Sequence, residues 1–339
     1  MYMSVRLQRL PDWCKPIVFV DMNSIEPFYT ILSKGKLFIV VRRVDESNLL
    51  VVHKARYEQD YNGIKITRII NTYSPREVVS STSILTHDPR YGVSIPLYNT
   101  QADKGAIVCS HREASHQYIC KLRKDIHHFN IVSEFKRKVG INIYFTGSLL
   151  LGYALRSSDI DLVVAGYKSA CKIIDILSEL LHDGIVKPLT PRELREWAMR
   201  EACSRGLSVA DIVKLYSPYS RFKFMNITFS LSYYEPHYRS QPERRIFVID
   251  SNDVVKDECI IEDYYPQVLD YPHIARVVTC KRLKNLDYIV SFDGIYFATM
   301  FTKNKIQVRG VKGQLIDSVN RERILVAGIR EAVTLITPL

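Results

Sequence analysis

The chain has 339 residues, of which 47% are hydrophobic and 24% charged, with 14 glycines and 14 prolines. This composition is that of a globular protein and excludes a disordered or fibrous chain. At roughly 100–200 residues per domain, the length predicts two or three domains. The formal net charge of +11 favours polyanionic partners such as nucleic acid or nucleotides.

The cysteines and the apolar runs bear on the compartment. The seven cysteines include no CxxC pair, the first residues lack the apolar core of a signal peptide, and no apolar run approaches the ~18 residues of a spanning helix. We therefore expect reduced thiols, no zinc site, no membrane partner and a cytoplasmic protein.

The first third of the chain reads as β-rich. β-branched and aromatic residues separated by turn formers predict strands at 15–22, 36–44, 48–57 and 64–73. Ser74, Pro75 and Glu77 form a capping box that predicts a helix start. A change of hydrophobic period near residue 112 places the first domain boundary there.

The centre of the chain alternates helices and strands. Apolar residues at three- and four-residue steps predict a helix from Ser115 to Val139, with Gly140 as its stop. A strand at 141–145, a short helical stretch at 149–155, a strand at 159–166 and a helix at 168–182 follow. Capping boxes at 190–193 and 208–211 predict two more helices, and residues 222–234 read as strand again.

The last third is β-rich again. Seven short strands are expected, at 244–250, 258–264, 275–280, 287–292, 296–301, 305–311 and 322–329. Their number and spacing predict a small barrel or sandwich. This module either binds nucleic acid or has a structural or dimerisation role. The expected fold class is α+β. The expected domains are a β-rich module at 1–112, an α/β core at 113–242 and a β module at 243–339.

Two acidic residues in the core stand out. In the strand DIDLVV, alternation directs Asp159, Asp161 and Val163 to one face and Ile160 and Leu162 to the other. Like charges held this close repel, and a divalent cation between them offsets the repulsion. The pair therefore predicts a metal site.

A glycine-serine turn precedes this strand by ten residues. Gly147 allows a sharp turn and a close approach of phosphate, and Ser148 offers a hydroxyl donor. Gly147-Ser148, the spacer 149–158 and Asp159-Ile160-Asp161 together resemble the nucleotidyltransferase superfamily typified by DNA polymerase β. The resemblance implies an NTP substrate, with two Mg²⁺ (or Mn²⁺) ions on Asp159 and Asp161.

The wider layout narrows the resemblance. VVHKARY in the first module, TGSLLLG and SDIDLVV are similar to a family of uncharacterised archaeal predicted nucleotidyltransferases. The resemblance implies a fold and a reaction class, namely transfer of a nucleoside monophosphate to a hydroxyl of RNA, DNA or protein. It leaves the oligomeric state open.

The superfamily's third carboxylate has no clear counterpart. Asn226, in Met225-Asn226-Ile227, stands where the later core strand is expected to carry an acid, and an amide cannot act as a general base. Asp250, or Asp253 beyond it, completes the site if the core sheet includes that strand. The alternatives are a slow or altered enzyme, a complete site with Asp250, and a nucleotide-binding or nucleic-acid-binding protein without turnover.

Basic and hydroxyl residues near the site are candidates for phosphate contacts. Arg156 and Ser158 precede Asp159 and are either triphosphate contacts or ordinary loop residues. Arg221 and Lys223 lead into the segment that carries Asn226, and they are the best candidates for contacting nucleic-acid phosphates.

Overall fold

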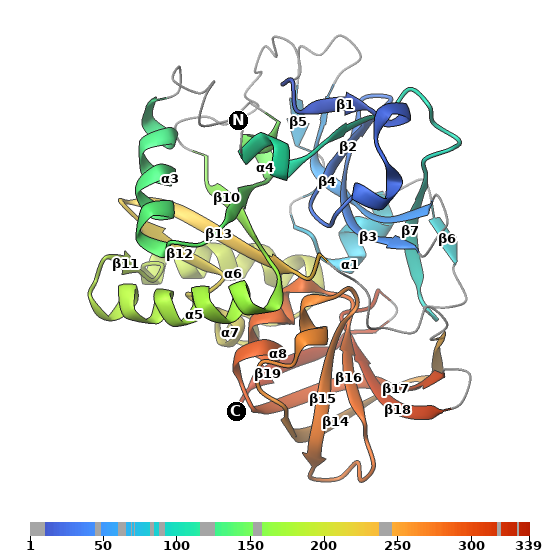
Figure 1. The fold of residues 1–339 in the computed structure, drawn as a ribbon. Coiled ribbons are helices and arrows are strands. Elements are labelled where there is room, and N and C mark those ends of the chain that lie inside the picture. Colours follow the sequence, from blue (N-terminus) through green and yellow to red (C-terminus); the bar gives the residue numbers. More distant parts are fainter. Residues whose placement is uncertain are drawn as a thin grey trace. The chain divides into compact units, whose positions relative to one another are not determined.

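The computed structural model describes residues 11–44, 49–59, 66–68, 70, 72–81, 85–87, 92–115, 126–151, 158–236, 246–316, 320–330 and 332–339. The chain forms two compact units, each discontinuous in sequence (Figure 1). Unit 1 comprises 1–69, 98–190 and 218–236, and unit 2 comprises 70–97, 191–217 and 237–339. The three consecutive domains expected from the sequence stay a prediction.

Unit 1 begins with an antiparallel sheet. Its strands follow the order β1-β8-β2-β3-β4, with β5 paired to β4. The elements of this part are β1 (Cys14–Pro16), η1 (Ile17–Phe19), η2 (Met22–Ser24), β2 (Thr30–Ser33), β3 (Lys36–Val44), β4 (Leu49–Gln59), β5 (Ile66–Arg68) and β8 (Ile107–Cys109). The strand expected at 15–22 is wrong, since two 3₁₀ turns follow the three residues of β1.

The rest of unit 1 is a five-stranded mixed sheet with helices. The strand order is β11-β12-β13-β10-β9, and β10 runs parallel to β13. The elements are α3 (Ile126–Val139), β9 (Ile143–Phe145), α4 (Gly147–Leu150), β10 (Ile160–Ala165), α5 (Tyr167–His182), β11 (Val186–Lys187), β12 (Arg221–Phe224) and β13 (Ile227–Tyr234). Most of these match the strands and helices expected from the sequence.

One face of this sheet is closed by helices. Phe135 of α3 packs against Phe222, Phe224 and Phe229 at ring-centroid distances of 4.9–5.5 Å. Helix α5 contacts α3, β10 and β11 (Figure 1). Its apolar stripe is buried. Because strand side chains alternate, the opposite face carries the other half of each strand, including Asp161 and Ser230.

The expected strand at 222–234 is instead a hairpin. Met225 and Asn226 have φ angles of 48° and 63°, and they form a two-residue turn between β12 and β13. Asparagine tolerates this left-handed conformation better than most residues. The sequence pattern missed the turn because both of its strands share one hydrophobic character.

Unit 2 contains a closed ring of strands. β14 pairs with β15 and β17, β15 with β16, β16 with β18, and β18 with β17. This ring, with one parallel pair (β16 and β18) and a helix between its third and fourth strands, has the topology of an OB-fold barrel. Of the two architectures expected from the sequence, the pairings form the barrel.

The elements of unit 2 are α1 (Pro75–Ser81), β6 (Leu85–His87), β7 (Ser94–Asn99, whose last two residues fall in unit 1), α6 (Pro191–Arg205), α7 (Val209–Leu215), β14 (Ile246–Ile261), η4 (Pro266–Leu269), β15 (His273–Cys280), β16 (Tyr288–Ser291), η5 (Gly294–Tyr296), α8 (Phe297–Thr302), β17 (Lys305–Ile316), β18 (Arg321–Ala327) and β19 (Leu335–Pro338). Two of the predicted capping hydroxyls are confirmed. The Ser74 and Ser208 hydroxyls accept from the Glu77 and Asp211 N–H groups at 3.3 and 3.0 Å.

One strand predicted in the tail, at 296–301, is wrong, and two others belong to one strand. Residues 297–302 form helix α8, in which Phe297, Met300 and Phe301 share a buried helical face. The Asp293 carboxylate accepts from Ile295 N–H at 3.1 Å and caps the 3₁₀ turn η5 just before it. The segments predicted as separate strands at 244–250 and 258–264 belong largely to the single strand β14, which has an irregularity between Ile249 and Val254.

Two pairs of cysteines form disulfides, contrary to the expected reduced thiols. Cys14 pairs with Cys109 between β1 and β8, and Cys259 pairs with Cys280 between β14 and β15. In each pair the cysteines face each other across antiparallel strands, which the spacing in the sequence does not reveal. Cys171 and Cys203 are free thiols.

Candidate active site

The glycine-serine turn and the acidic strand meet in space. Gly147 has φ +61°, and a Cβ added there would lie 2.5 Å from Asp161 Oδ2. The Thr146 N–H donates to the Asp161 carbonyl at 3.0 Å. Only glycine therefore lets the turn close on the carboxylate, and the two halves of the motif form one site.

The two carboxylates lie on the open face of the sheet. Ile160 and Leu162 are fully buried on the closed face, as the alternation predicts, whereas Asp161 is half-buried and Asp159 is exposed. Asp161 lies level with Ser230 of the parallel strand β13. The expected orientation of the acidic pair is therefore confirmed.

A guanidinium group contacts one carboxylate of this pair. Arg221 Nη2 donates to Asp159 Oδ2 at 2.5 Å, and Nη1 donates to Ser230 Oγ at 2.7 Å. The sequence placed Arg221 near phosphate, but here its charge neutralises Asp159. A metal ion between the carboxylates would share Asp159 with this cation or displace it.

Asn226 lies in the turn between β12 and β13, four residues before Ser230, and not on the strand where it was expected. Its role as a third ligand stays a prediction. The residue level with Asp161 is Ser230, a neutral hydroxyl. The sequence could not show this, because the register depends on where the hairpin turns.

Asp250 does not belong to this sheet. It lies on β14, in the barrel of unit 2, where Gln314 Nε2 donates to its carboxylate at 3.2 Å. The five-stranded sheet contains no strand from this region. The condition under which Asp250 would complete the site is therefore not met by the core sheet.

The remaining predicted phosphate contacts flank the motif in the sequence, and their role stays a prediction. Ser148 is half-buried in α4, and Ser158 is half-buried directly before Asp159, whereas Arg156 lies outside the described residues. Thr146, which the sequence passed over, has a buried Oγ1 without a hydrogen-bond partner in the described part of the chain. A polar ligand or a water molecule bound next to Gly147 would supply the hydrogen bond that this hydroxyl lacks.

The donor set suits a hard divalent cation. Asp159 and Asp161 supply carboxylate oxygens and Ser230 supplies a hydroxyl, which are the ligand types that Mg²⁺ and Mn²⁺ prefer. The fit is to an ion held chiefly by the two aspartates, because no third acid lies level with them on β13.

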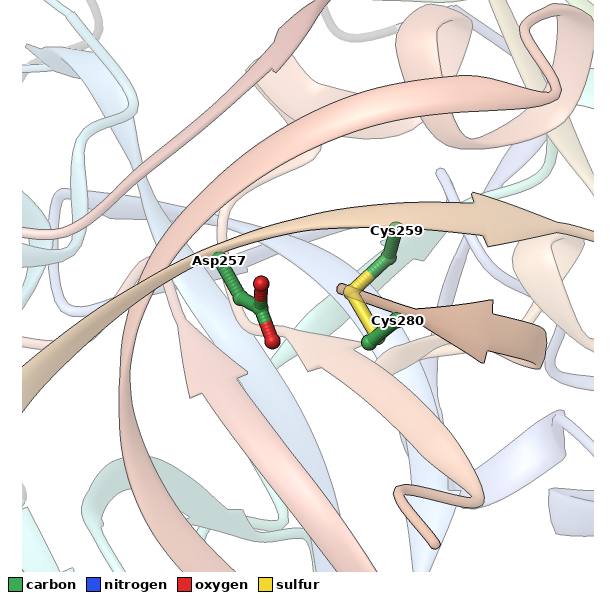
Figure 2. A group of neighbouring side chains, drawn as sticks. All are labelled: Asp257, Cys259 and Cys280. Atoms are coloured by element: carbon green, nitrogen blue, oxygen red, sulfur yellow. A yellow bond between two sulfur atoms is a disulfide. The ribbon is translucent and has the colours of Figure 1, made fainter. Parts of the chain in front are cut away.

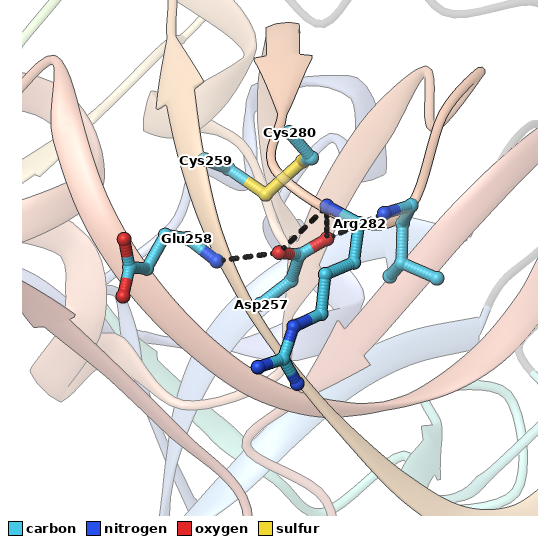
Figure 3. Close-up of a disulfide and its surroundings, with 6 residues drawn as sticks. Asp257, Glu258, Cys259, Cys280 and Arg282 are labelled. Carbon is cyan, nitrogen blue, oxygen red and sulfur yellow. Dashed lines mark hydrogen bonds between the residues drawn. A yellow bond between two sulfur atoms is a disulfide. The ribbon is translucent and has the colours of Figure 1, made fainter.

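A second group of ligand-type side chains lies in the barrel. Figure 2 shows Asp257, Cys259 and Cys280 close together, but the two sulfur atoms are bonded to each other. The Asp257 carboxylate accepts backbone N–H groups from Glu258, Arg282 and Leu283 at 2.6–3.1 Å (Figure 3). The group therefore fixes the loop after β15 and leaves its ligand atoms engaged.

Comparison with known families bears on the same segment. Residues 129–234 match the family model of the nucleotidyltransferase domain. The match runs from α3 to the end of β13, so it contains the Gly147 turn, both aspartates and the whole five-stranded sheet. This supports the superfamily resemblance for about a third of the chain.

Nucleotidyltransferase domains use an NTP and a divalent metal ion, which agrees with the donor set above. No curated protein and no solved structure matches the chain. Among the described residues, none of the helices is both long and apolar enough to cross a membrane.

Proposed function

We propose that the protein is a metal-dependent nucleotidyltransferase that moves a nucleoside monophosphate from an NTP to a hydroxyl of RNA, DNA or protein. The observation that carries the proposal is the closure of the Gly147 turn on the Asp161 carboxylate. This contact brings a phosphate-binding turn to a pair of carboxylates, within the segment that matches the nucleotidyltransferase domain.

In this proposal some residues bind the metal ion and others bind the triphosphate. Asp159 and Asp161 hold Mg²⁺ or Mn²⁺, and Gly147, Ser148 and Ser158, with Arg156, bind the triphosphate. The bound metal supplies positive charge for the phosphoryl oxygens. The acceptor oxygen bonds to the α-phosphorus, the bond to the β-phosphate breaks, and pyrophosphate leaves while the hydroxyl proton passes to solvent.

The missing third acid limits this chemistry. In related reactions a positioned base contributes about 10²–10⁴-fold. Since Ser230 stands level with Asp161 and Asn226 lies in a turn, we expect slow turnover. The Arg221–Asp159 ion pair favours a second candidate, a nucleotide-binding protein that retains the fold without turnover.

The test supplies the full chain with each of four radiolabelled NTPs, Mg²⁺ or Mn²⁺, and total RNA. We expect label in the RNA from one nucleotide, and its loss in Asp161→Asn, which keeps the size of the side chain and removes its charge. Metal-dependent NTP binding without transfer establishes the second candidate. Absence of NTP binding overturns both.

The proposal includes a cytoplasmic location. Disulfides are rare in the reducing cytosol, with intracellular proteins of hyperthermophiles as the exception. Counting the free thiols of the protein in a native cell extract tests whether the two disulfides form in the cell. When Cys14–Cys109 and Cys259–Cys280 are oxidised, four cysteines do not react with the thiol reagent.

A further inference from the structure

Positive charge gathers at the β11 edge of the five-stranded sheet. Lys187 of β11 lies level with Lys223 of β12, on antiparallel strands. Side chains in such pairs share a face, with Cβ atoms about 4.5–5.5 Å apart, and like charges directly opposite are destabilising. A bound anion would offset this repulsion.

The two lysines line a cavity of about 620 Å³. Helix α3 contributes Lys138 and Glu134, which form an ion pair at 3.7 Å. Lys187 forms no ion pair with any residue that the structure describes. Three lysines against one glutamate leave the cavity with net positive charge.

Apolar side chains border the same cavity. Ile185 is 37% exposed and Met225 is 58% exposed, and both line it. A free phosphate ion has no apolar surface to pack against these side chains, whereas a nucleic acid strand carries sugars and bases beside its phosphates. The combination of ammonium groups and exposed apolar groups suits a phosphodiester strand.

Strand β12 connects this cavity to the carboxylates. Lys223 follows Arg221 by two residues on the same face, a distance of about 7 Å, and Arg221 contacts Asp159. Lys138 comes from α3, which covers the opposite face, so the cavity lies at the β11 edge of the sheet. A strand held at this edge lies close enough to extend past Lys223 towards the acidic pair.

The distribution of charge favours the core over the barrel. Residues 246–339 contain twelve Lys and Arg and twelve Asp and Glu, so the barrel segment has no net positive charge despite its OB-fold topology. The excess charge of the protein therefore lies in the other segments. Because non-specific binding of nucleic acid is chiefly electrostatic, this neutrality argues against the barrel as the main contact.

We propose that the cavity lined by Lys138, Lys187 and Lys223 binds the phosphodiester backbone of a single-stranded nucleic acid, whose terminal hydroxyl is the acceptor at Asp159 and Asp161. The inference rests on the proposed function for the role of that strand, but the binding itself needs neither metal nor NTP.

The experiment measures binding of fluorescein-labelled 20-nucleotide single-stranded RNA and DNA to the full chain in EDTA, over a range of salt concentrations. For single strands, log K falls with log[salt] with a slope of about −0.7 per phosphate neutralised. We expect Lys187→Ala/Lys223→Ala to weaken binding at least about tenfold at low salt and to reduce the slope by about 1.4.

The control is Lys168→Ala/Lys172→Ala, which removes the same charge from exposed positions on α5. This variant is expected to bind about as tightly as the wild type. Equal affinity and slope for the cavity variant and the wild type overturn the inference, as does equal loss in both variants. Competition by inorganic tripolyphosphate at the concentration of strand phosphates also overturns it, because it shows a generic anion site.

The outcome is separable from that of the proposed function. Asp161→Asn should bind the strands as the wild type does, since that residue is outside the cavity. If the wild type transfers label to an acceptor but binds neither RNA nor DNA, this inference is contradicted and the proposed function stands. Strand binding without transfer supports the inference at the level of binding and contradicts the enzyme.

Discussion

The two faces of the five-stranded sheet use the same strands for different purposes. On the closed face, Phe222 and Phe229 are fully buried and stack against each other under α3. On the open face, their neighbours Arg221 and Ser230 form polar contacts that reach Asp159. Along each strand, a buried residue that stabilises the fold is thus followed by a residue on the face that carries the aspartates.

The open face is itself covered at one end. Tyr234, at the end of β13, donates to Glu26 at 2.6 Å and contacts the buried His111, while Arg112 lies over the ring of Tyr144. These contacts come from the first β module within unit 1. Segments beside the N-terminal sheet therefore close the far end of the face, and the end with Asp159 and Asp161 stays partly exposed.

The largest expected effect is the difference in stability loss between a substitution on the closed face and one on the open face. Phe229→Ala removes a buried ring that contacts Phe135, Phe222 and Phe224, and we expect a loss of about 3–5 kcal/mol in the free energy of unfolding. Ser230→Ala, the next residue along, should cost about 1 kcal/mol, since it loses one hydrogen bond. Urea denaturation of the full chain measures both, and equal losses would contradict the division into faces.

Gly147→Ala tests whether the turn and the carboxylate form one site. The added Cβ meets the Asp161 carboxylate at 2.5 Å, at a φ of +61°, so we expect a loss of about 2–4 kcal/mol and of metal-dependent NTP binding. Gly140→Ala is the matched control, because Gly140 has φ +60° with no atom within 4 Å. It should cost about 1–2 kcal/mol and leave NTP binding unchanged.

The covered end of the face should respond to pH through His111. Burial lowers the pKa of His111 to about 3, so the folded protein keeps the ring neutral. The unfolded chain takes up a proton below about pH 6.5, and the free energy of unfolding therefore falls as the pH decreases, by about 2 kcal/mol at pH 5. Since His273 has a lowered pKa as well, the contribution of His111 is read as a difference between variants.

His111→Phe keeps a ring beside Tyr29, Tyr144 and Tyr234 and removes the titration. Its loss of the hydrogen bond to the Pro27 carbonyl is independent of pH over this range. Between pH 7 and pH 5 we expect the free energy of unfolding, measured by urea denaturation, to fall by about 2 kcal/mol less in the variant than in the wild type. Parallel pH profiles would show that His111 is charged or accessible in the folded protein.

The smallest effect on stability should come from Arg221→Gln. The Arg221–Asp159 ion pair is partly exposed, with Asp159 at 46%, so its loss should cost less than about 1 kcal/mol. Mn²⁺ affinity, measured by the paramagnetic broadening of water or by calorimetry, should rise several-fold, because a competing cation leaves Asp159. Arg192→Gln, which breaks the exposed pair with Glu196, should leave Mn²⁺ affinity unchanged. A fall in affinity in Arg221→Gln would show instead that Arg221 orients Asp159.

The disulfides show how far cysteine spacing can mislead. Cys14 and Cys109 are 95 residues apart, and Cys259 and Cys280 are 21 apart. Each pair becomes adjacent only through the pairing of antiparallel strands. The expectation of reduced thiols relied on the absence of CxxC pairs and on the lack of a signal-peptide core, and neither feature reports strand register.

Local patterns in the sequence determined most elements of the core and the position of its chemistry. Alternation in DIDLVV set the direction of both aspartates, the hydroxyls of Ser74 and Ser208 set helix starts, and Gly147 marked the turn. These features depend on neighbours in the chain, where steric and hydrogen-bonding preferences act directly. The same reasoning failed at residues 297–302, since aromatic residues suit a strand and a buried helix equally well.

Only the tertiary structure decided what completes the site. Ser230 rather than Asn226 lies level with Asp161, Arg221 rather than an acid contacts Asp159, and Asp250 belongs to a barrel. Each of these facts depends on strand register and sheet membership, which bring together residues about 60–70 positions apart in the core. No local pattern carries that information, because register is set by where a hairpin turns and by which apolar faces bury each other.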